Sequence, residues 1–548
     1  MIVGVDFGTC FSSVAVMDGK IAKDNMTGDL EQVLGNTALG IPSLFMYSKE
    51  QKKEVYGAGC LAANPHENSD VIKYMKREVR KDPQNIGLKY PTGGKEYLLE
   101  DIIGKYVMYL VKSVKDEISN SGDVDSTDIE VLTITKPVGI AEGQMMAADY
   151  SRLLKDKMIE ITGLNPKKIH LLDEPVAAAI AYLYEQDLRR KIDGIKHILV
   201  FDLGGGTLDT TIVRYNPLAR TYEIIVKNGD LELGGKDWDD ALGKILLEKN
   251  GISLDDLSED EKGNFWNAVT ELKIGLSTKE EDVQQFKYGG NKIYLECSAQ
   301  EFESACTDLL ERSRKVLTGT IDQLKDGVES LDGIILVGGS SNMPMILNMI
   351  TSQYPDFDKE KISTYRPSKA IARGAAIYSY FHTDDGGMVG GGGEVIDSSN
   401  CSYGFSCLRG MKEKMIYNGI IKGEKYKDGF IETLSSRFTA VNNDQKAVRF
   451  DIYESTWISP NAVNDADPSE GYAPEDDEFR WMPLNSGESK NGMSVTVQVP
   501  PEYDGRARSW GVYARFRLSS DGILDLTIED EQGNKVGFAT NKGVRNGQ

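Results

Sequence analysis

The chain has 548 residues, 40% of them hydrophobic and 27% charged, which is typical of a soluble globular protein with several domains. A formal net charge of −22 argues against general nucleic-acid binding, because an acidic surface repels phosphate backbones. No apolar run approaches the roughly 18 residues of a membrane span, and the few scattered cysteines and histidines argue against a disulfide framework or structural zinc site.

Strand and helix patterns alternate along the first two thirds of the chain. Ile2–Asp6 predicts a strand and lacks the features of a signal peptide, so we expect a cytoplasmic protein. Apolar residues recur at helical spacing over Asp101–Ser119. Further elements are expected in the order strand, helix, strand and helix, over residues 128–135, 139–161, 168–172 and 175–184, with Pro175 in the first turn of the last helix. This alternation favours a mainly parallel sheet covered by helices.

One short unit of sequence occurs twice. An apolar strand ends in Asp6 and runs into Phe7-Gly8-Thr9, and a second ends in Asp202 and runs into the turn 204–207, Gly-Gly-Gly-Thr. A hairpin-like strand follows each copy, and a third apolar strand runs into Gly338-Gly339. The duplication predicts two similar lobes that face each other across a cleft.

These turns have the composition of a phosphate-binding site. Glycines let backbone N–H groups approach phosphate oxygens, and a carboxylate at a strand end can hold Mg²⁺ through water. Three consecutive glycines between strands weaken a sheet, so their presence indicates that a ligand or another segment of backbone approaches closely there. The two units together therefore predict a cleft that grips a nucleoside triphosphate from both sides. The P-loop motif of the common NTPases is absent from the sequence.

The composition changes after His382. Residues 384–396 form a glycine-rich connector with little apolar surface for docking, although we also consider Glu394–Asp397 as a short docking strand. Residues 397–532 contain short alternating runs that predict an all-β sandwich. Residues 533–548 show no helical period, and we expect a flexible tail there.

These motifs resemble the DnaK-type, seventy-kilodalton heat-shock chaperones of the actin-like ATPase superfamily. The resemblance covers most of residues 1–383 and, more weakly, 397–530. It implies an α/β fold with a two-lobed actin-like (duplicated ribonuclease-H) ATPase domain over residues 1–383, followed by the β-sandwich. The matching segments are Val5–Cys10, Leu172–Pro175, Asp202–Asp209, Leu233–Asp237, Val337–Pro344 and Pro367–Ala376.

The resemblance implies ATP or ADP and Mg²⁺ as cofactors. Asp6 and Asp202 would place Mg²⁺ through its water shell, and Lys76 would position the attacking water and steady charge on the γ-phosphate. Glu174 would complete this network, and Asp209 would orient groups near the water. Lys76, Glu174, Asp202, Thr207 and Asp209 are thus the expected catalytic residues. The expected nucleotide contacts are Gly8, Thr9, Cys10, Gly204, Gly205, Gly206, Thr207, Gly234, Lys273, Ser277, Gly338, Gly339 and Ser340.

Several positions depart from the family pattern. Asn342 stands where an arginine usually covers the adenine, and Thr270 where glutamate is usual, so we expect a looser grip on the base. Met145 stands where an arginine serves communication between domains. The other departures are Cys10 for threonine, Lys236 for an acidic residue and Ser368 for aspartate.

In the β domain, the resemblance implies a groove for an extended peptide. The positions expected to line it are Phe405, Leu408, Phe438, Val441 and Val448, with Leu408 and Val441 arching over the peptide. Because no helical segment is predicted after the sandwich, we expect the family's helical lid to be missing.

The favoured function is therefore an ATP-hydrolysing chaperone whose lidless β-sandwich binds extended peptides. Its partners would be unfolded or extended polypeptides, with a J-domain co-chaperone and a nucleotide-exchange factor, and neither nucleic acid nor membrane. Three alternatives stay open: a small-molecule kinase of the same superfamily, a nucleotide-binding module that hydrolyses poorly, and an actin-like filament.

Overall fold

The computed structural model describes residues 1–17, 40–62, 70–81, 88–121, 129–138, 146–189, 191–367, 369–383, 393–399, 401–409, 413–427, 429–455, 472–474, 481–484, 493–520 and 523–540. Two compact units divide the chain. The first comprises Met1–Gly139 and Leu153–Val395, and the second comprises Ile140–Arg152 and Ile396–Gln548. Among the helices of the described residues, none has the length and apolar character needed to cross a membrane.

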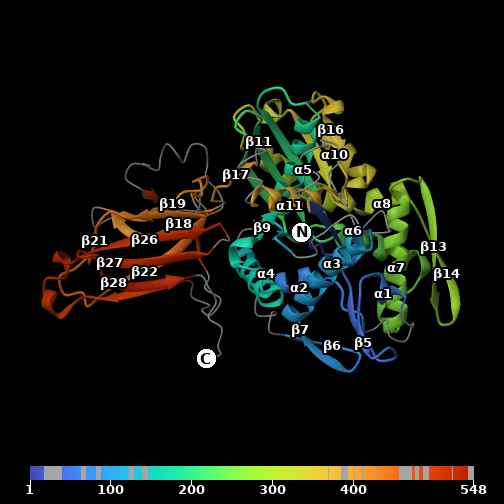
Figure 1. Cartoon of the computed structure of the whole chain (residues 1–548), viewed down its shortest axis with the longest axis horizontal. Coiled ribbons are helices and arrows are strands. Elements are labelled where there is room, and N and C mark those ends of the chain that lie inside the picture. Colours follow the sequence, from blue (N-terminus) through green and yellow to red (C-terminus); the bar gives the residue numbers. More distant parts are fainter. Residues whose placement is uncertain are drawn as a thin grey trace. The chain divides into compact units, whose positions relative to one another are not determined.

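Two sheets of matching topology form the centre of the first unit (Figure 1). The first sheet has the order β3-β2-β1-β8-β9, and the second has the order β16-β15-β10-β11-β12-β17. In each, a central strand, β1 or β10, pairs antiparallel with the strand that follows it and parallel with a later one. This correspondence confirms the predicted duplication. The strands of the two sheets are β1 Ile2–Asp6, β2 Phe11–Met17, β3 Ile41–Pro42, β8 Val131–Lys136, β9 Ile169–Asp173, β10 Lys196–Leu203, β11 Leu208–Asn216, β12 Thr221–Asp230, β15 Gly333–Val337, β16 Ile362–Thr364 and β17 Glu394–Ile396.

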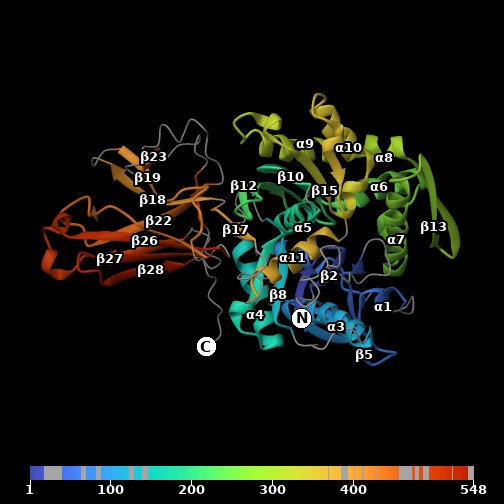
Figure 2. The same ribbon diagram turned by 45° about the horizontal axis from the view of Figure 1, so that its top comes forward.

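Two helices, α5 (Glu174–Leu188) and α11 (Ala370–Phe381), pack against each other and connect the sheets (Figure 2). Helix α11 packs on β1, β2 and β8, whereas α5 packs on β10 and β11. Their approach is so close that a Cβ atom on Gly374 would lie 1.7 Å from the carbonyl oxygen of Ala177. On the other side of α11, a Cβ atom on Gly4 would lie 2.1 Å from the backbone nitrogen of Ala376. Glycine at positions 4 and 374 therefore sets the spacing of these elements.

The first unit also contains the other α-helices and the three hairpins of the described residues, apart from the start of α4, which belongs to the second unit. The predicted helix over 101–119 is confirmed as α3, and Pro175 lies in the first turn of α5 as expected. Trp238 and Phe265 are fully buried in the large core beside the second sheet. The elements are α1 Ala58–Leu61, α2 Met75–Lys81, α3 Leu99–Ser121, α4 Met146–Thr162, α6 Gly235–Asn250, α7 Glu259–Leu276, α8 Ala299–Ala305, α9 Thr307–Ile321, α10 Pro344–Gln353, and the hairpins β4 Phe45–Ser48 with β5 Lys53–Tyr56, β6 Lys89–Thr92 with β7 Lys95–Leu98, and β13 Glu281–Tyr288 with β14 Asn291–Ser298.

The end of the predicted connector is a strand. Residues Glu394–Ile396 form β17 at the edge of the second sheet, next to β12. The backbone N–H of Glu394 donates to the carbonyl oxygen of Arg220 over 3.0 Å, and Val395 packs against the buried core. The expectation of little apolar docking surface is therefore wrong for this segment, and the alternative of a short docking strand over Glu394–Asp397 agrees with β17, because Val395 supplies the apolar side chain that the glycines lack. Residues 384–392 lie outside the described residues.

The second unit is a β-sandwich, as predicted. One sheet has the order β23-β19-β18-β22-β24, with β25 also paired to β22, and the other has the order β20-β26-β27-β28, with β21 paired to β26. Phe405, Phe450 and Phe516 from both sheets share one buried core. The strands are β18 Ser402–Arg409, β19 Glu413–Ile420, β20 Phe430–Leu434, β21 Phe438–Thr439, β22 Ala447–Ser455, β23 Tyr472–Pro474, β24 Met482–Pro483, β25 Ser494–Gln498, β26 Gly511–Ser519, β27 Leu524–Asp530 and β28 Lys535–Thr540.

Strand β28 corrects the predicted boundary of this domain. Lys535–Thr540 pairs antiparallel with β27, so this part of the expected flexible tail belongs to the sandwich. Gly533, with φ +80°, makes the turn between the two strands, and Asp530 accepts hydrogen bonds inside it. Residues 541–548 lie outside the described residues.

Candidate active site

The two duplicated loops lie against each other where β1 and β10 end. A Cβ atom on Gly205 would lie 2.5 Å from the Sγ atom of Cys10. A Cβ atom on Gly206 would lie 2.7 Å from the Oγ1 atom of Thr9. Because a side chain on Gly205 or Gly206 would collide with Cys10 or Thr9, these two glycines allow the close contact between the loops. The predicted pairing of these loops is thus present in the structure.

Two further loops, which follow β12 and β15 of the second sheet, join this contact. A Cβ atom on Gly234 would lie 2.3 Å from the backbone of Gly206, and one on Gly338, with φ +80°, would lie 2.4 Å from the carbonyl oxygen of Leu203. The N–H of Gly235 donates to the carbonyl oxygen of Gly204 over 2.9 Å. The predicted contact residues Gly204, Gly205, Gly206, Thr207, Gly234, Gly338, Gly339 and Ser340 are therefore brought together.

A buried ion pair links α2 to the start of α5. The ammonium group of Lys76 contacts Oε1 of Glu174, and the two residues are only 2% and 6% exposed. Glu174 is the first residue of α5, where the helix dipole favours a negative charge. An isolated buried lysine or glutamate would be costly, so this contact fixes both side chains. The two predicted catalytic residues are thus direct partners.

Three aspartates lie beside this pair. Burial, followed by the nearby Glu174 carboxylate, raises the pKa of Asp6 to about 7, although Lys76 opposes the shift. Burial and the carboxylates of Glu174, Asp209 and Asp6 raise the pKa of Asp202 well above its usual range. Asp209 faces Asp202 in the β10–β11 pairing, and its Oδ1 accepts a hydrogen bond from the N–H of Val138 over 3.2 Å. Like charges are therefore concentrated at the ends of β1 and β10.

The residues at this point fit Mg²⁺ held through water. Oδ1 of Asp202 is buried and has no hydrogen-bond partner among the described residues, and a Cβ atom on Gly338 would lie 2.6 Å from it. Carboxylate oxygens are the ligands that hard cations prefer, and a cation would offset the burial and the repulsion that raise the pKa values of Asp6 and Asp202. Within the described parts of the chain, no three side chains of metal-ligating type are close enough to hold an ion directly.

The predicted nucleoside contacts are only partly assembled. Lys273 is buried, donates to the carbonyl oxygen of Gly235 over 2.7 Å and forms an ion pair with Asp239 at 2.8 Å. The hydroxyl of Ser277 donates to the carbonyl oxygen of Lys273, so it bonds within its own helix. Asn342 is exposed, and its Nδ2 donates to the carbonyl oxygen of Gly339 over 3.0 Å. Ser368 and Met145 lie outside the described residues.

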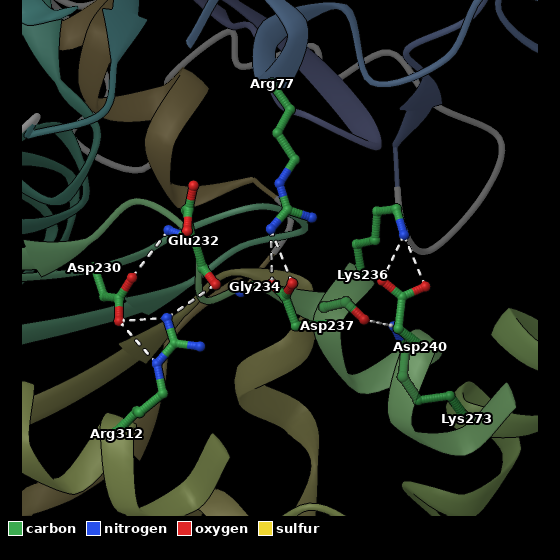
Figure 3. Close-up of polar contacts among 10 residues, drawn as sticks. Arg77, Asp230, Glu232, Gly234, Lys236, Asp237, Asp240, Lys273 and Arg312 are labelled. Carbon is green, nitrogen blue, oxygen red and sulfur yellow. Dashed lines mark hydrogen bonds and ion pairs between the residues drawn. The ribbon is translucent and has the colours of Figure 1, made fainter. Parts of the chain in front are cut away.

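A second ion pair crosses between α2 and α6 (Figure 3). The guanidinium group of Arg77 reaches both carboxylate oxygens of Asp237, at 2.9 and 3.1 Å. Beside it, Lys236 pairs with Asp240 and lies 5.7 Å from the ring centres of both Tyr74 and Trp266. Sequence reasoning missed Arg77, although its position directly after Lys76 was the available signal.

The expected peptide-groove residues differ in exposure. Leu408 and Val441 are 38% and 37% exposed, as a surface role requires. Phe405 is only 1% exposed and packs on Tyr417, Phe438, Phe450 and Phe516, so it belongs to the core of the sandwich instead of an open surface. Phe438 and Val448 are partly buried against the same core.

Comparison with known proteins identifies the family. The model of the Hsp70 protein family matches residues 59–458. This chain belongs to the Hsp70 protein family. A chaperone protein HscA homolog of Paracidovorax citrulli (strain AAC00-1) is 26% identical over 523 residues, which cover 91% of this chain and 78% of that protein. Another HscA homolog, from Variovorax paradoxus (strain S110), is 27% identical over 425 residues, covering 76% of this chain and 63% of that protein, which is less than two thirds of its length.

Membership of the Hsp70 family accounts for the architecture described above. The duplicated sheets joined by α5 and α11 agree with the actin-like ATPase fold that the resemblance implies, and a β-sandwich follows. The fold class is therefore an α/β actin-like domain followed by an all-β domain.

Proposed function

We propose that this chain is an ATP-dependent chaperone of the Hsp70 type, which hydrolyses ATP in the first unit. The observation that carries the proposal is the buried Lys76–Glu174 pair beside Asp6, Asp202 and Asp209. The glycine loops that meet at the same strand ends support phosphate binding, since backbone N–H groups can approach phosphates there. Relatives named as chaperones support the same function.

The residues of the cluster would divide the work of hydrolysis. Thr9, Thr207 and the backbone of 204–206 would hold the phosphates. Lys76, kept in place by Glu174, would orient the attacking water and offset charge on the γ-phosphate. Asp209, anchored by the N–H of Val138, would orient the same water. Asp6 and Asp202 would hold the water shell of Mg²⁺, which when bound supplies positive charge to the phosphate oxygens.

The β-sandwich would bind the polypeptide. Exposed Leu408 and Val441 would contact an extended segment, which a sheet can hold by backbone hydrogen bonds and one apolar pocket. A J-domain co-chaperone and a nucleotide-exchange factor are the partners that this proposal implies.

An ATPase assay with the variant Lys76→Ala tests the proposal. We expect release of ADP without any added acceptor, and stimulation by an unfolded polypeptide. Lys76→Ala should reduce the rate at least about a hundredfold, the scale for loss of one charge-stabilising group, while calorimetry shows ATP binding largely retained. ADP formation only with an added acceptor would favour the kinase, no ADP at all would favour the binding module, and normal turnover by Lys76→Ala would contradict the assignment of Lys76.

A further inference from the structure

A second group of buried charges lies next to the proposed catalytic pair. The carboxylate of Asp173 is held between two lysines: Lys136 contacts Oδ1 at 2.6 Å, and Lys227 contacts Oδ2 at 2.6 Å. The side chains of Lys136, Asp173 and Lys227 are only 12%, 5% and 3% exposed. We call these three residues the lysine clamp. Neither the sequence motifs nor the proposed hydrolysis gives them a role.

The lysine clamp connects the two sheets. Lys136 ends β8 and Asp173 ends β9 in the first sheet, whereas Lys227 lies on β12 in the second sheet. Lys227 is paired with Thr211 on β11, close to Asp209 on the same strand. The Lys227–Asp173 ion pair therefore crosses from the second sheet to the first, next to the strand that carries Asp209.

The lysine clamp also fixes the backbone from which Glu174 projects. Asp173 is the N-cap residue of α5, yet its side chain makes no capping hydrogen bond. It faces the two lysines, and the next residue, Glu174, pairs with Lys76. Burial opposes ionisation of Asp173, but the two ammonium groups outweigh it and hold its pKa below the usual range. Consecutive carboxylates at the start of one helix are thus anchored by different lysines.

The segment that carries Lys136 touches other site residues in turn. The hydroxyl of Thr135 donates to Oδ1 of Asp6 over 3.5 Å, and the N–H of Val138 donates to Oδ1 of Asp209 over 3.2 Å. A shift of this segment would therefore move three anchoring contacts together. A misplacement of about 1 Å in a catalytic group can cost about a hundredfold in rate.

We propose that Asp173, held by Lys136 and Lys227, is a positioning residue that sets Glu174, and through it Lys76, for ATP hydrolysis. Lys227 is the only one of the three on the second sheet, so its contact with Asp173 ties the start of α5 to the position of that sheet. The inference deepens the proposed function and rests on it.

The substitution Lys227→Gln tests this role without leaving an unbalanced carboxylate. The lysine clamp has two cations and one anion, so the variant retains the balanced Lys136–Asp173 pair. We expect the single-turnover hydrolysis rate to fall about tenfold to a hundredfold, while the affinity for ADP changes less than about threefold. Lys227→Arg keeps the cation and should recover most of the rate.

A matched control comes from a buried lysine away from the site. Lys157 pairs with Glu100, Asp101 and Glu160 and is 9% exposed, so Lys157→Gln also removes a buried cation. It should lower the melting temperature at least as much as Lys227→Gln but leave the hydrolysis rate within about threefold. Equal rate losses in the two glutamine variants would overturn the positioning role.

The link through Glu174 is tested in a double-mutant cycle. In a Glu174→Gln background, Lys227→Gln should lower the residual rate less than about twofold, because the group it positions is already lost. A full, multiplicative loss would overturn action through Glu174. If the parent protein hydrolyses ATP and Lys227→Gln does so at the same rate, the positioning role is overturned and the proposed function stands. If the parent protein does not hydrolyse ATP, the proposed function and the positioning role are both overturned.

Discussion

Asp6 shows how the acidic cluster opposes stability at the scale of one residue. Its pKa is raised to about 7, so the folded protein binds more protons than the unfolded chain between about pH 4 and 7. The contribution of Asp6 to the free energy of unfolding therefore falls as the pH rises through this window and stays constant above it. The carboxylate is an unfavourable charge until a cation offsets it.

We expect Asp6→Asn to raise the melting temperature of the protein without nucleotide or metal at pH 8, by on the order of 2–4 °C. The gain should shrink at pH 5, where the folded parent already carries a neutral Asp6. Added Mg²⁺ and ATP should stabilise the parent more than the variant. Calorimetric melting at both pH values checks this expectation, and a lower melting temperature for the variant at pH 8 would contradict the unfavourable charge at Asp6.

Asn342 provides a prediction about the base. It is exposed and held to Gly339, and it lacks the flat cation that would stack on adenine. We expect Asn342→Arg to tighten ATP binding about threefold to thirtyfold, the range of a cation–π contact, and to increase the preference for ATP over GTP. Asn348→Arg on the exposed side of α10 adds the same charge as a control. Equal gains in both variants would mean that only net charge matters.

The sequence could predict the site residues that lie in short motifs, where the neighbouring residues define the position. Asp6 and Asp202 follow apolar strands, and Lys76 and Glu174 stand in motifs with a fixed sequence of neighbours. Lys136 and Lys227 carry no such signal, because each lies in a strand pattern where lysine normally points to solvent. Their meeting at Asp173 depends on the pairing of distant strands, which a single sequence does not specify.

At the scale of elements, the glycine contacts that set the spacing of α5 and α11 give a direct test. We expect Gly374→Ala to lower the free energy of unfolding of the first unit by about 1–3 kcal/mol or more, because the added methyl group meets backbone atoms of Ala177 that cannot turn away. Gly263→Ala on α7 is the matched control, since nothing lies within 4 Å of its Cβ position. It should stabilise by about 0.5–1 kcal/mol. Denaturant unfolding measures both, and similar effects would contradict the close packing of α5 on α11.

A helix with strong periodicity was predictable, whereas the sequence left β17 as one of two alternatives and did not predict β28. The apolar spacing over 101–119 sufficed for α3 because a helix repeats its pattern over many turns. Strand β17 is only three residues long and follows glycines, so its pairing with β12 decides its structure. Strand β28 has a similar dependence on β27. Phe405 alternates as a groove residue would, yet its ring completes an aromatic core from both sheets.

At the scale of the whole molecule, β17 bears on communication between the units. A connector strand that is paired to the sheet can make contacts that differ between the ATP and ADP states, whereas a glycine chain offers few contacts. We expect peptide affinity to differ more than about tenfold between ATP and ADP, roughly 1.4 kcal/mol of coupling, and Val395→Gly to reduce that ratio severalfold. Val283→Gly, on an exposed strand of the β13–β14 hairpin, is the control. A ratio unchanged by Val395→Gly would mean that β17 does not contribute to coupling.

The contact between α11 and β1 also has a consequence for synthesis. The hydroxyl of Ser379 donates to the carbonyl oxygen of Val3 over 2.8 Å, across 376 positions of the chain. A ribosome adding about 5–20 residues per second needs roughly 20–75 s to make the helix that covers the first strand. Throughout that time the apolar face of Ile2–Asp6 awaits its partner, and the nascent chain is open to aggregation and proteolysis. A member of a chaperone family is thus, while it is being made, the kind of exposed chain that chaperones protect.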